Sequence, residues 1–128
     1  MSSGYSHKIV FKGGRTANAT SYNILSDGII AYYIGLADNY TKYDKDGKSQ
    51  FSFSKGYGMI DEIKGNFIVF KNDKKYFIFN NLINNWLKPN GHFISVKIRD
   101  FYVEAEYVEK NEPTTLLFDS KGNIMEKI

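Results

Sequence analysis

The amino-acid sequence predicts a mainly β fold, a single domain over residues 1–128 with seven to nine short antiparallel strands in a barrel-like or sandwich arrangement. An α+β layout, with a helix across one sheet, is the alternative. Ten Tyr and ten Phe in 128 residues favour strands. Gly, Asn or Asp separates apolar runs in five turn-like segments, residues 44–48, 63–67, 71–75, 88–92 and 120–124. The connections are too short for crossover helices, so we expect antiparallel pairing.

The expected strands follow from alternating or continuous apolar runs between these turns. Residues 7–12 alternate between two faces, and residues 28–37 are almost continuously apolar, which predicts a central strand covered on both sides. Further strands are expected at residues 49–54, 58–63, 66–70, 75–79, 92–99, 101–108, 114–119 and 123–128. The segment 58–63 also suits one helical turn, and we favour a strand.

One short packed helix is expected at about residues 81–88. Leu82, Ile83, Trp86 and Leu87 form one apolar stripe at helical spacing, and Asn81 can cap the start. Pro and Gly follow the stripe and end the helix.

A turn or bulge is expected at Arg99 and Asp100, because the buried positions change parity there. Ile94, Val96 and Ile98 are even-numbered, whereas the apolar set Phe101, Val103, Ala105 and Tyr107 is odd-numbered. A continuous strand keeps one parity on each face.

Glu104 and Glu106 then share the opposite face of that strand. Because Glu is mostly exposed unless it is paired, the pattern favours solvent-facing residues. The alternative is a catalytic pair. Arg15, the serine pair Ser52 and Ser54, and Glu104 with Glu106 together resemble the arginine, serine and glutamate pattern of ADP-ribosyltransferases. The resemblance implies an NAD-using enzyme in which Arg15 holds the diphosphate, Ser52 supports the pocket and Glu106 stabilises the oxocarbenium ion. Phe53 stands between the serines, where that family usually has Thr.

Several other classes of site are excluded or weakened by composition. The chain has no Cys, which excludes thiolate metal sites and Cys nucleophiles, and we expect no cofactor and no metal. A nuclease would have to use His7 or His92 with Arg15, Lys97 or Arg99 and a Glu. No segment has the roughly 18 apolar residues of a membrane span. We therefore expect a cytoplasmic protein, and the excess of Lys, Asn, Ile, Tyr and Phe suggests a low-GC bacterium or its phage.

The function expected from these observations is non-catalytic protein binding. The chain lacks an assembled nucleophile, metal or nucleotide motif, and exposed Tyr is enriched at protein interfaces. An inhibitor of the anti-defence or immunity type, encoded by a phage or mobile element, fits this profile. The expected contact residues are Tyr40, Tyr43, Tyr57, Tyr102, Lys97 and Arg99. A nucleic-acid or nucleotide binder with a Lys-lined groove is a further alternative, since Lys and aromatic residues interleave at residues 39–48 and 71–81.

Overall fold

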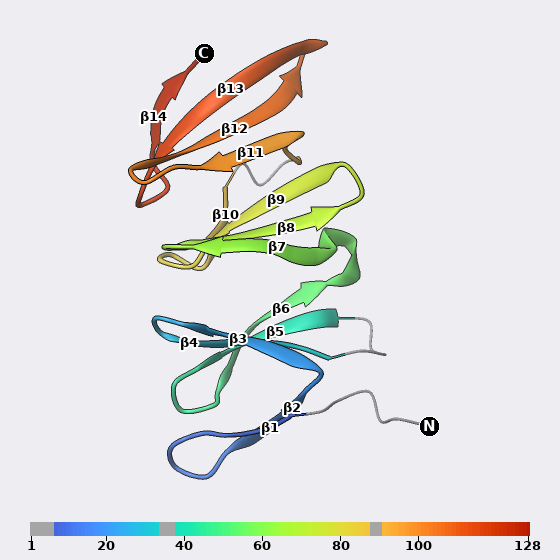
Figure 1. Ribbon diagram of the computed structural model, residues 1–128, viewed down its shortest axis with the longest axis vertical. Coiled ribbons are helices and arrows are strands. Elements are labelled where there is room, and N and C mark those ends of the chain that lie inside the picture. The colour runs from blue at the N-terminus through green and yellow to red at the C-terminus, as the bar shows by residue number, and fades with distance from the viewer. Residues whose placement is uncertain (1–6, 34–37, 88–90) are drawn as a thin grey trace. The chain divides into compact units, whose positions relative to one another are not determined.

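A computed structural model describes residues 7–33, 38–87 and 91–128, and nearly all of this part of the chain is antiparallel β-structure (Figure 1). The strands form four sheets, and none of them closes into a barrel. The mainly β, sandwich-like fold expected from the aromatic content and the turns is confirmed.

The strands are short, and each pairs with the strand next to it in the sequence. The first six are β1 (His7–Val10), β2 (Thr16–Ala19), β3 (Ser21–Leu25), β4 (Gly28–Tyr32), β5 (Asp38–Asp44) and β6 (Ser49–Ser54). The next four are β7 (Met59–Lys64), β8 (Phe67–Asn72), β9 (Lys75–Asn80) and β10 (Asn85–Trp86). The last four are β11 (Ser95–Ile98), β12 (Tyr102–Glu109), β13 (Glu112–Asp119) and β14 (Ile124–Lys127). A single 3-10 turn, η1 (Lys55–Tyr57), is the only helix in the described residues.

The chain divides into two compact units, one ending at Gly56 and the other beginning at Tyr57. The single domain expected over residues 1–128 stays a prediction. The first unit contains the β1-β2 hairpin and the sheet β3-β4-β5-β6. β4 pairs on both sides and buries Ile30 and Ala31 on opposite faces, so the central strand expected from residue 28 is confirmed for Gly28–Tyr32. The continuation at residues 34–37 lies outside the described residues.

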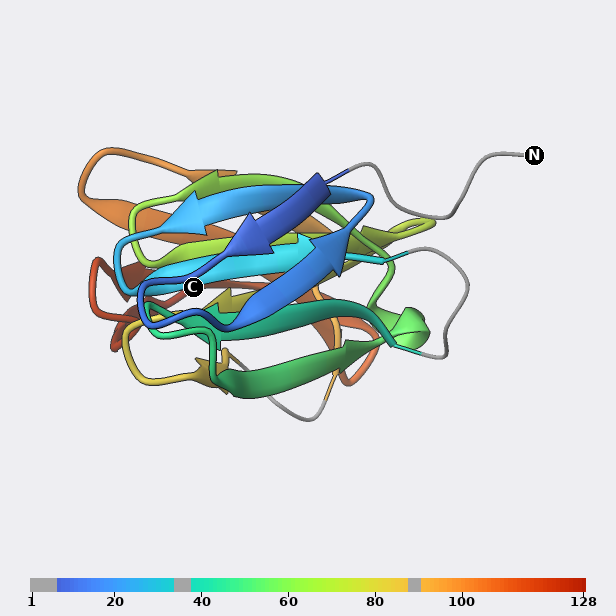
Figure 2. The same cartoon turned by 90° about the horizontal axis from the view of Figure 1, so that it is seen from below.

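The β1-β2 hairpin lies across one face of the β3-β6 sheet (Figures 1 and 2). Its side chains contact that sheet at two points. The His7 and Tyr22 rings are 5.2 Å apart, and the Phe11 and Tyr43 rings are 5.6 Å apart. The hairpin therefore covers part of this face with aromatic contacts.

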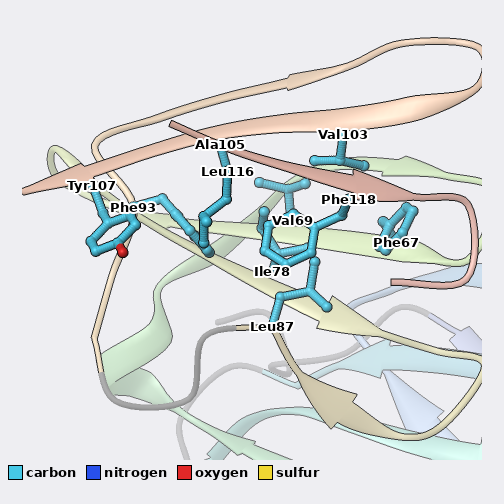
Figure 3. Close-up of a cluster of buried hydrophobic side chains, with 10 residues drawn as sticks. All are labelled: Phe67, Val69, Ile78, Leu87, Phe93, Val103, Ala105, Tyr107, Leu116 and Phe118. Atoms are coloured by element: carbon cyan, nitrogen blue, oxygen red, sulfur yellow. The ribbon is translucent and has the colours of Figure 1, made fainter. Parts of the chain in front are cut away.

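The second unit packs the sheet β7-β8-β9-β10 against the sheet β11-β12-β13-β14. Figure 3 shows the side chains that meet between the sheets. They are Phe67, Val69, Ile78, Leu87, Phe93, Val103, Ala105, Tyr107, Leu116 and Phe118. Burial of each large apolar side chain contributes about 1.5–3 kcal/mol, so this cluster is the main source of stability of the second unit.

The sheets β3-β6 and β11-β14 share one pairing register. Ser21 pairs with Tyr32 as Ser95 pairs with Glu106, and each sheet has a bulge one residue before the Asp that ends its third strand. These two residues, Asp44 and Asp119, close the same turn. In each turn the carboxylate Oδ1 accepts two backbone N–H groups at 2.9 Å, and a Gly with positive φ (Gly47 or Gly122) ends the turn.

The connection between the second and third strands is one residue longer in the β11-β14 sheet. Tyr32 pairs with Tyr40, eight positions later, whereas the equivalent Glu106 pairs with Thr115, nine positions later. The sheets β3-β6 and β11-β14 are therefore structural repeats within one chain. Strict repeats of this size are not visible in the sequence, because few side chains are identical at equivalent positions.

The helix expected at 81–88 is wrong. Residues 81–84 form a turn and Asn85–Trp86 is the strand β10, while residue 88 lies outside the described residues. Asn80 Oδ1 accepts the Leu82 N–H, and Asn84 has a positive φ of 51°. Asn competes with a helix in this way, and an isolated helix of eight residues is marginal.

Two further expectations about strands need correction. The described residues contain fourteen strands, not seven to nine, because segments expected as loops, such as Thr16–Ala19, pair as short strands. The turn expected at Arg99 and Asp100 is confirmed, since β11 ends at Ile98 and β12 begins at Tyr102. However, Ile94 and Phe101, which were expected to be buried, are both exposed. Phe101 lies in the turn between the strands, and Ile94 lies one residue before β11, with its N–H bonded to the Glu106 carbonyl.

Candidate functional site

A surface hollow of about 210 Å³ lies in the second unit, at the end of the sheets where three hairpin turns meet. The β7-β8 turn contributes Gly65 and Asn66, the β11-β12 turn contributes Arg99 to Phe101, and the β13-β14 turn contributes Ser120. The remaining lining residues are Lys64, Phe67, Ile98, Tyr102 and Val103. The floor is therefore apolar and the rim carries charge.

Phe101 is the most unusual residue of this rim, because its side chain is 83% exposed. The turn forces this exposure, since Arg99 donates its N–H to the carbonyl of Tyr102 and the residues between them cannot enter either strand. Large apolar residues that are exposed singly are common, but an exposed Phe beside an apolar hollow and an Arg is typical of a contact surface.

The hollow is lined by two cationic side chains, Lys64 and Arg99, and by one carboxylate, Asp100. Lys64 Nζ lies 3.6 Å from Asp100 Oδ1, and both side chains are well exposed. The Arg99 side chain is exposed, and no ion pair of its guanidinium occurs within residues 7–33, 38–87 and 91–128. An Arg in this state can form a bidentate contact with a carboxylate of a partner.

Two asparagines hold the turns that frame the hollow. Asn66 Nδ2 donates to the carbonyl of Ser120 at 3.2 Å, and Asn80 Nδ2 donates to the carbonyl of Lys121 at 2.7 Å. Asn81 also donates its backbone N–H to the carbonyl of Asn66 at 2.7 Å. These bonds tie the β13-β14 turn to the β7-β10 sheet, so the hollow is preformed.

A second hollow of the same unit, of about 240 Å³, is lined by Tyr57, Lys75, Phe77, Trp86, Leu87, Gly91 and His92. The Tyr57 and Trp86 rings are stacked, with centroids 4.2 Å apart and an angle of 23° between the planes. The stacking occupies one face of each ring. Leu87 and Gly91 line this hollow, and residues 88–90 between them in the sequence lie outside the described part of the chain.

The residues expected as contacts are distributed over both units. Tyr102 and Arg99 line the first hollow and Tyr57 the second. Tyr40 is only 5% exposed, so the expectation that it is an exposed tyrosine is wrong. It lies on the interior strand β5 beside Tyr32 and Phe53, and alternation turns its ring inward.

Tyr43 is half-buried and contacts Phe11, whereas Lys97 is exposed on β11 and pairs across the strands with Glu104. Opposite charges at a cross-strand position stabilise a sheet modestly, by roughly 0.2–1 kcal/mol. Lys97 therefore lies opposite Glu104 on the outer face of its sheet, and no ion pair joins the two within residues 7–33, 38–87 and 91–128.

The five residues of the transferase pattern are divided between the two units. Arg15 lies in the β1-β2 turn and Ser52 and Ser54 are exposed on β6, all in the first unit. Glu104 and Glu106 are half-buried on β12 in the second unit, on the face opposite the core, beside Lys97 and Thr115. Neither glutamate lines a hollow described above, and the catalytic pattern stays a prediction.

Three further features bear on metal binding, membrane insertion and nuclease chemistry. They contain no group of three or more His, Cys, Asp or Glu side chains placed to hold a metal ion. No helix in residues 7–33, 38–87 and 91–128 has the length and apolar character needed to cross a membrane. His7 and His92, which a nuclease would use, lie in different units.

Comparison with known proteins leaves the site to be judged on its own geometry. No protein-family model matches the chain, no curated protein matches its sequence, and no solved structure matches it.

Sequence reasoning missed Phe101 and Asn66 as residues of the hollow. The signal for Phe101 was available, since an aromatic residue placed at a parity change must lie in or beside a turn. Asn66 had no such signal, because its role depends on the β13-β14 turn, which is distant in sequence.

Proposed function

We propose that this protein is a non-catalytic protein-binding module, and that the hollow framed by the β7-β8, β11-β12 and β13-β14 turns is its contact site. The observation that carries the proposal is Phe101, 83% exposed beside an apolar hollow that also presents Tyr102 and Arg99. Phe, Tyr and Arg are the side chains enriched where interfaces concentrate their binding energy.

The size of the hollow favours a protein partner over a small-molecule substrate. Its volume of about 210 Å³ is below the range of roughly 300–1,000 Å³ typical of ligand pockets. A hollow of this size can accept one apolar side chain of a partner. Arg99 supplies a position for a carboxylate next to it.

We expect a few residues of the contact site to supply most of the binding free energy. Burial of an exposed Phe is worth about 1.5–3 kcal/mol, so Phe101→Ala should weaken binding by about tenfold to 150-fold. Arg99→Ala should weaken it further. Val108→Ala is the matched control, since Val108 is an exposed apolar residue on β12 outside the hollow.

The test is capture of partners on the immobilised protein, followed by measurement of affinity for the captured protein with each variant. We expect a stoichiometric protein that survives a high-salt wash, is lost with Phe101→Ala and is retained with Val108→Ala. Recovery of only salt-labile nucleic acid, or equal binding by Phe101→Ala, would refute the proposal. An inhibitor of the anti-defence or immunity type would be one protein that acts through such a site, and that role stays a prediction.

A further inference from the structure

The β1-β2 hairpin has the same turn geometry as the last hairpin of each repeat sheet, β5-β6 in the first and β13-β14 in the second. Its turn uses the same backbone bonds as the turns after Asp44 and Asp119. Phe11 donates to the carbonyl of Arg15 at 2.8 Å, and Gly14 donates to the carbonyl of Phe11 at 3.0 Å. By this correspondence β1 is equivalent to β5 and β13, the third strands of the repeats, and β2 is equivalent to β6 and β14, the fourth strands.

In the complete repeats the third strand is paired on both edges, but β1 is paired only with β2 among the described strands. In an antiparallel ladder every second residue directs its N–H and C=O groups toward the same neighbouring strand. Because the Phe11 N–H bonds to Arg15, the backbone groups of Ile9 also face β2. The N–H and C=O groups of Lys8 and Val10 then point away from β2. An edge of this kind is a template for another strand.

The sheet face beneath this edge is apolar and only partly covered. Ile24 is 78% exposed, and it pairs with Ile29 across the strands. A hollow of about 370 Å³ lies there, lined by His7, Lys8, Ile9, Tyr22, Ile24 and Ile29.

The second repeat shows what such a face looks like when it is covered. Ile98 is equivalent to Ile24 and Val103 is equivalent to Ile29, by the shared register. Val103 is fully buried, and Ile98 packs against the core of the second unit. The strand β12, which includes Val103, alternates apolar residues facing the core with glutamates facing outward.

The charge beside the open edge indicates the character of the missing strand. Lys8, Lys12 and Arg15 are all exposed, and the sequence has no Asp or Glu between residues 7 and 26. A segment with carboxylates would complement this charge.

We propose that β1 binds an acidic extended segment of a partner protein by strand addition, with the alternate apolar side chains of that segment covering Tyr22, Ile24 and Ile29. This surface belongs to the first unit, and its existence does not depend on the hollow at Phe101. Backbone hydrogen bonds to Lys8 and Val10 supply affinity for the added strand. The apolar face fixes the register of that strand by accepting its alternate apolar side chains. The exposed cations favour segments that carry carboxylates.

The test uses a synthetic peptide with the sequence of residues 101–109, FYVEAEYVE, because this segment has the required alternation of apolar residues and glutamates. A labelled peptide is titrated with the full chain and its anisotropy is measured. The matched peptide FYVKAKYVK keeps the apolar pattern and reverses the charge. We expect saturable binding of the acidic peptide, and binding at least tenfold weaker for the basic one.

Two variants test the surface. Ile24→Glu places a charge on the apolar face, and Val10→Pro removes an N–H that faces the open edge without removing a bond to β2. Each is expected to weaken binding of the acidic peptide at least tenfold, while Ile83→Glu, at an isoleucine 62% exposed in the second unit, leaves it unchanged. Circular dichroism, compared with that of the unaltered protein, confirms that each variant is folded.

Three results would overturn the proposal. One is the absence of saturable binding, or binding that Ile24→Glu and Val10→Pro leave unchanged. Another is a concentration-dependent dimer that Ile24→Glu abolishes, which would assign this face to a second copy of the chain. The last is displacement of the peptide by a single-stranded oligonucleotide, which would assign the basic edge to nucleic acid.

Discussion

The side-chain amide of Asn80 is expected to be worth several times more to stability than that of Asn66, although both donate to carbonyls of the same β13-β14 turn. Asn80 is completely buried, its Nδ2 bonds to the carbonyl of Lys121 at 2.7 Å, and its Oδ1 accepts the Leu82 N–H at 3.0 Å. Asn66 is more exposed, and its single bond to Ser120 is longer, at 3.2 Å.

The magnitude follows from these contacts. Each hydrogen bond contributes roughly 0.5–1.5 kcal/mol net, and loss of a buried partner adds a desolvation term of about 1–3 kcal/mol. Asn80→Ala should therefore cost about 2–4 kcal/mol. Asn66→Ala should cost about 0.5–1 kcal/mol, because water replaces the lost donor at an exposed site.

The assay is urea unfolding followed by the fluorescence of Trp86, the only Trp in the chain. Trp86 lies on β10 and pairs with Phe79, next to Asn80, so its signal follows the second unit. With an m-value of about 2 kcal/mol/M, Asn80→Ala should lower the midpoint by about 1–2 M. Equal midpoint shifts for the two variants would refute the idea that burial of the Asn80 amide holds the turn in place.

The remaining predictions concern charge. Lys42 is fully buried with its Nζ 3.0 Å from Asp27 Oδ2, so Asp27→Ala should cost about 3 kcal/mol, whereas the double variant with Lys42→Met should recover most of that loss in urea unfolding. A cost for Asp27→Ala below about 1 kcal/mol would instead class the pair with exposed ion pairs. The Asn123 and Lys121 N–H groups lower the pKa of the Asp119 carboxyl below its ordinary value, the Asn123 bond being the larger cause. Its stabilising contribution is then complete above the ordinary carboxyl pKa and is lost as the pH falls through the lower folded-state pKa, so the stability difference between the protein and Asp119→Asn should shrink as the solution is acidified below the ordinary pKa. A constant difference across this range would contradict the assignment.

Local sequence patterns predicted the strands and turns well where the deciding forces were themselves local. The alternation around Val103 and Ala105 and the parity change at Arg99 were sufficient to place β12 and the turn before it. The helix expected at 81–88 failed because its apolar spacing suited a helix, while Asn80 Oδ1 and Asn85 Oδ1 accept the N–H groups of Leu82 and Trp86 and Asn84 takes a positive φ.

The candidate site was predictable only in part. Tyr102 and Arg99 could be named from residue type, but the hollow that joins them to Lys64 and Asn66 depends on turns far apart in the sequence. Tyr40 was misplaced for the opposite reason, because a tyrosine between two polar residues reads as exposed until its strand is known to be interior. Long-range pairing, not composition, decided both outcomes.

Every sheet in the part of the chain that the structure describes pairs strands that are consecutive in the sequence, and this order has a kinetic consequence. The loops that must close before each ladder forms are short, so the entropic cost of closing them is small. β-proteins usually fold slowly because their contacts join distant parts of the sequence, whereas here most ladders join neighbouring strands. During synthesis each sheet can therefore pair as soon as its own residues have left the ribosome, before the next sheet has been made.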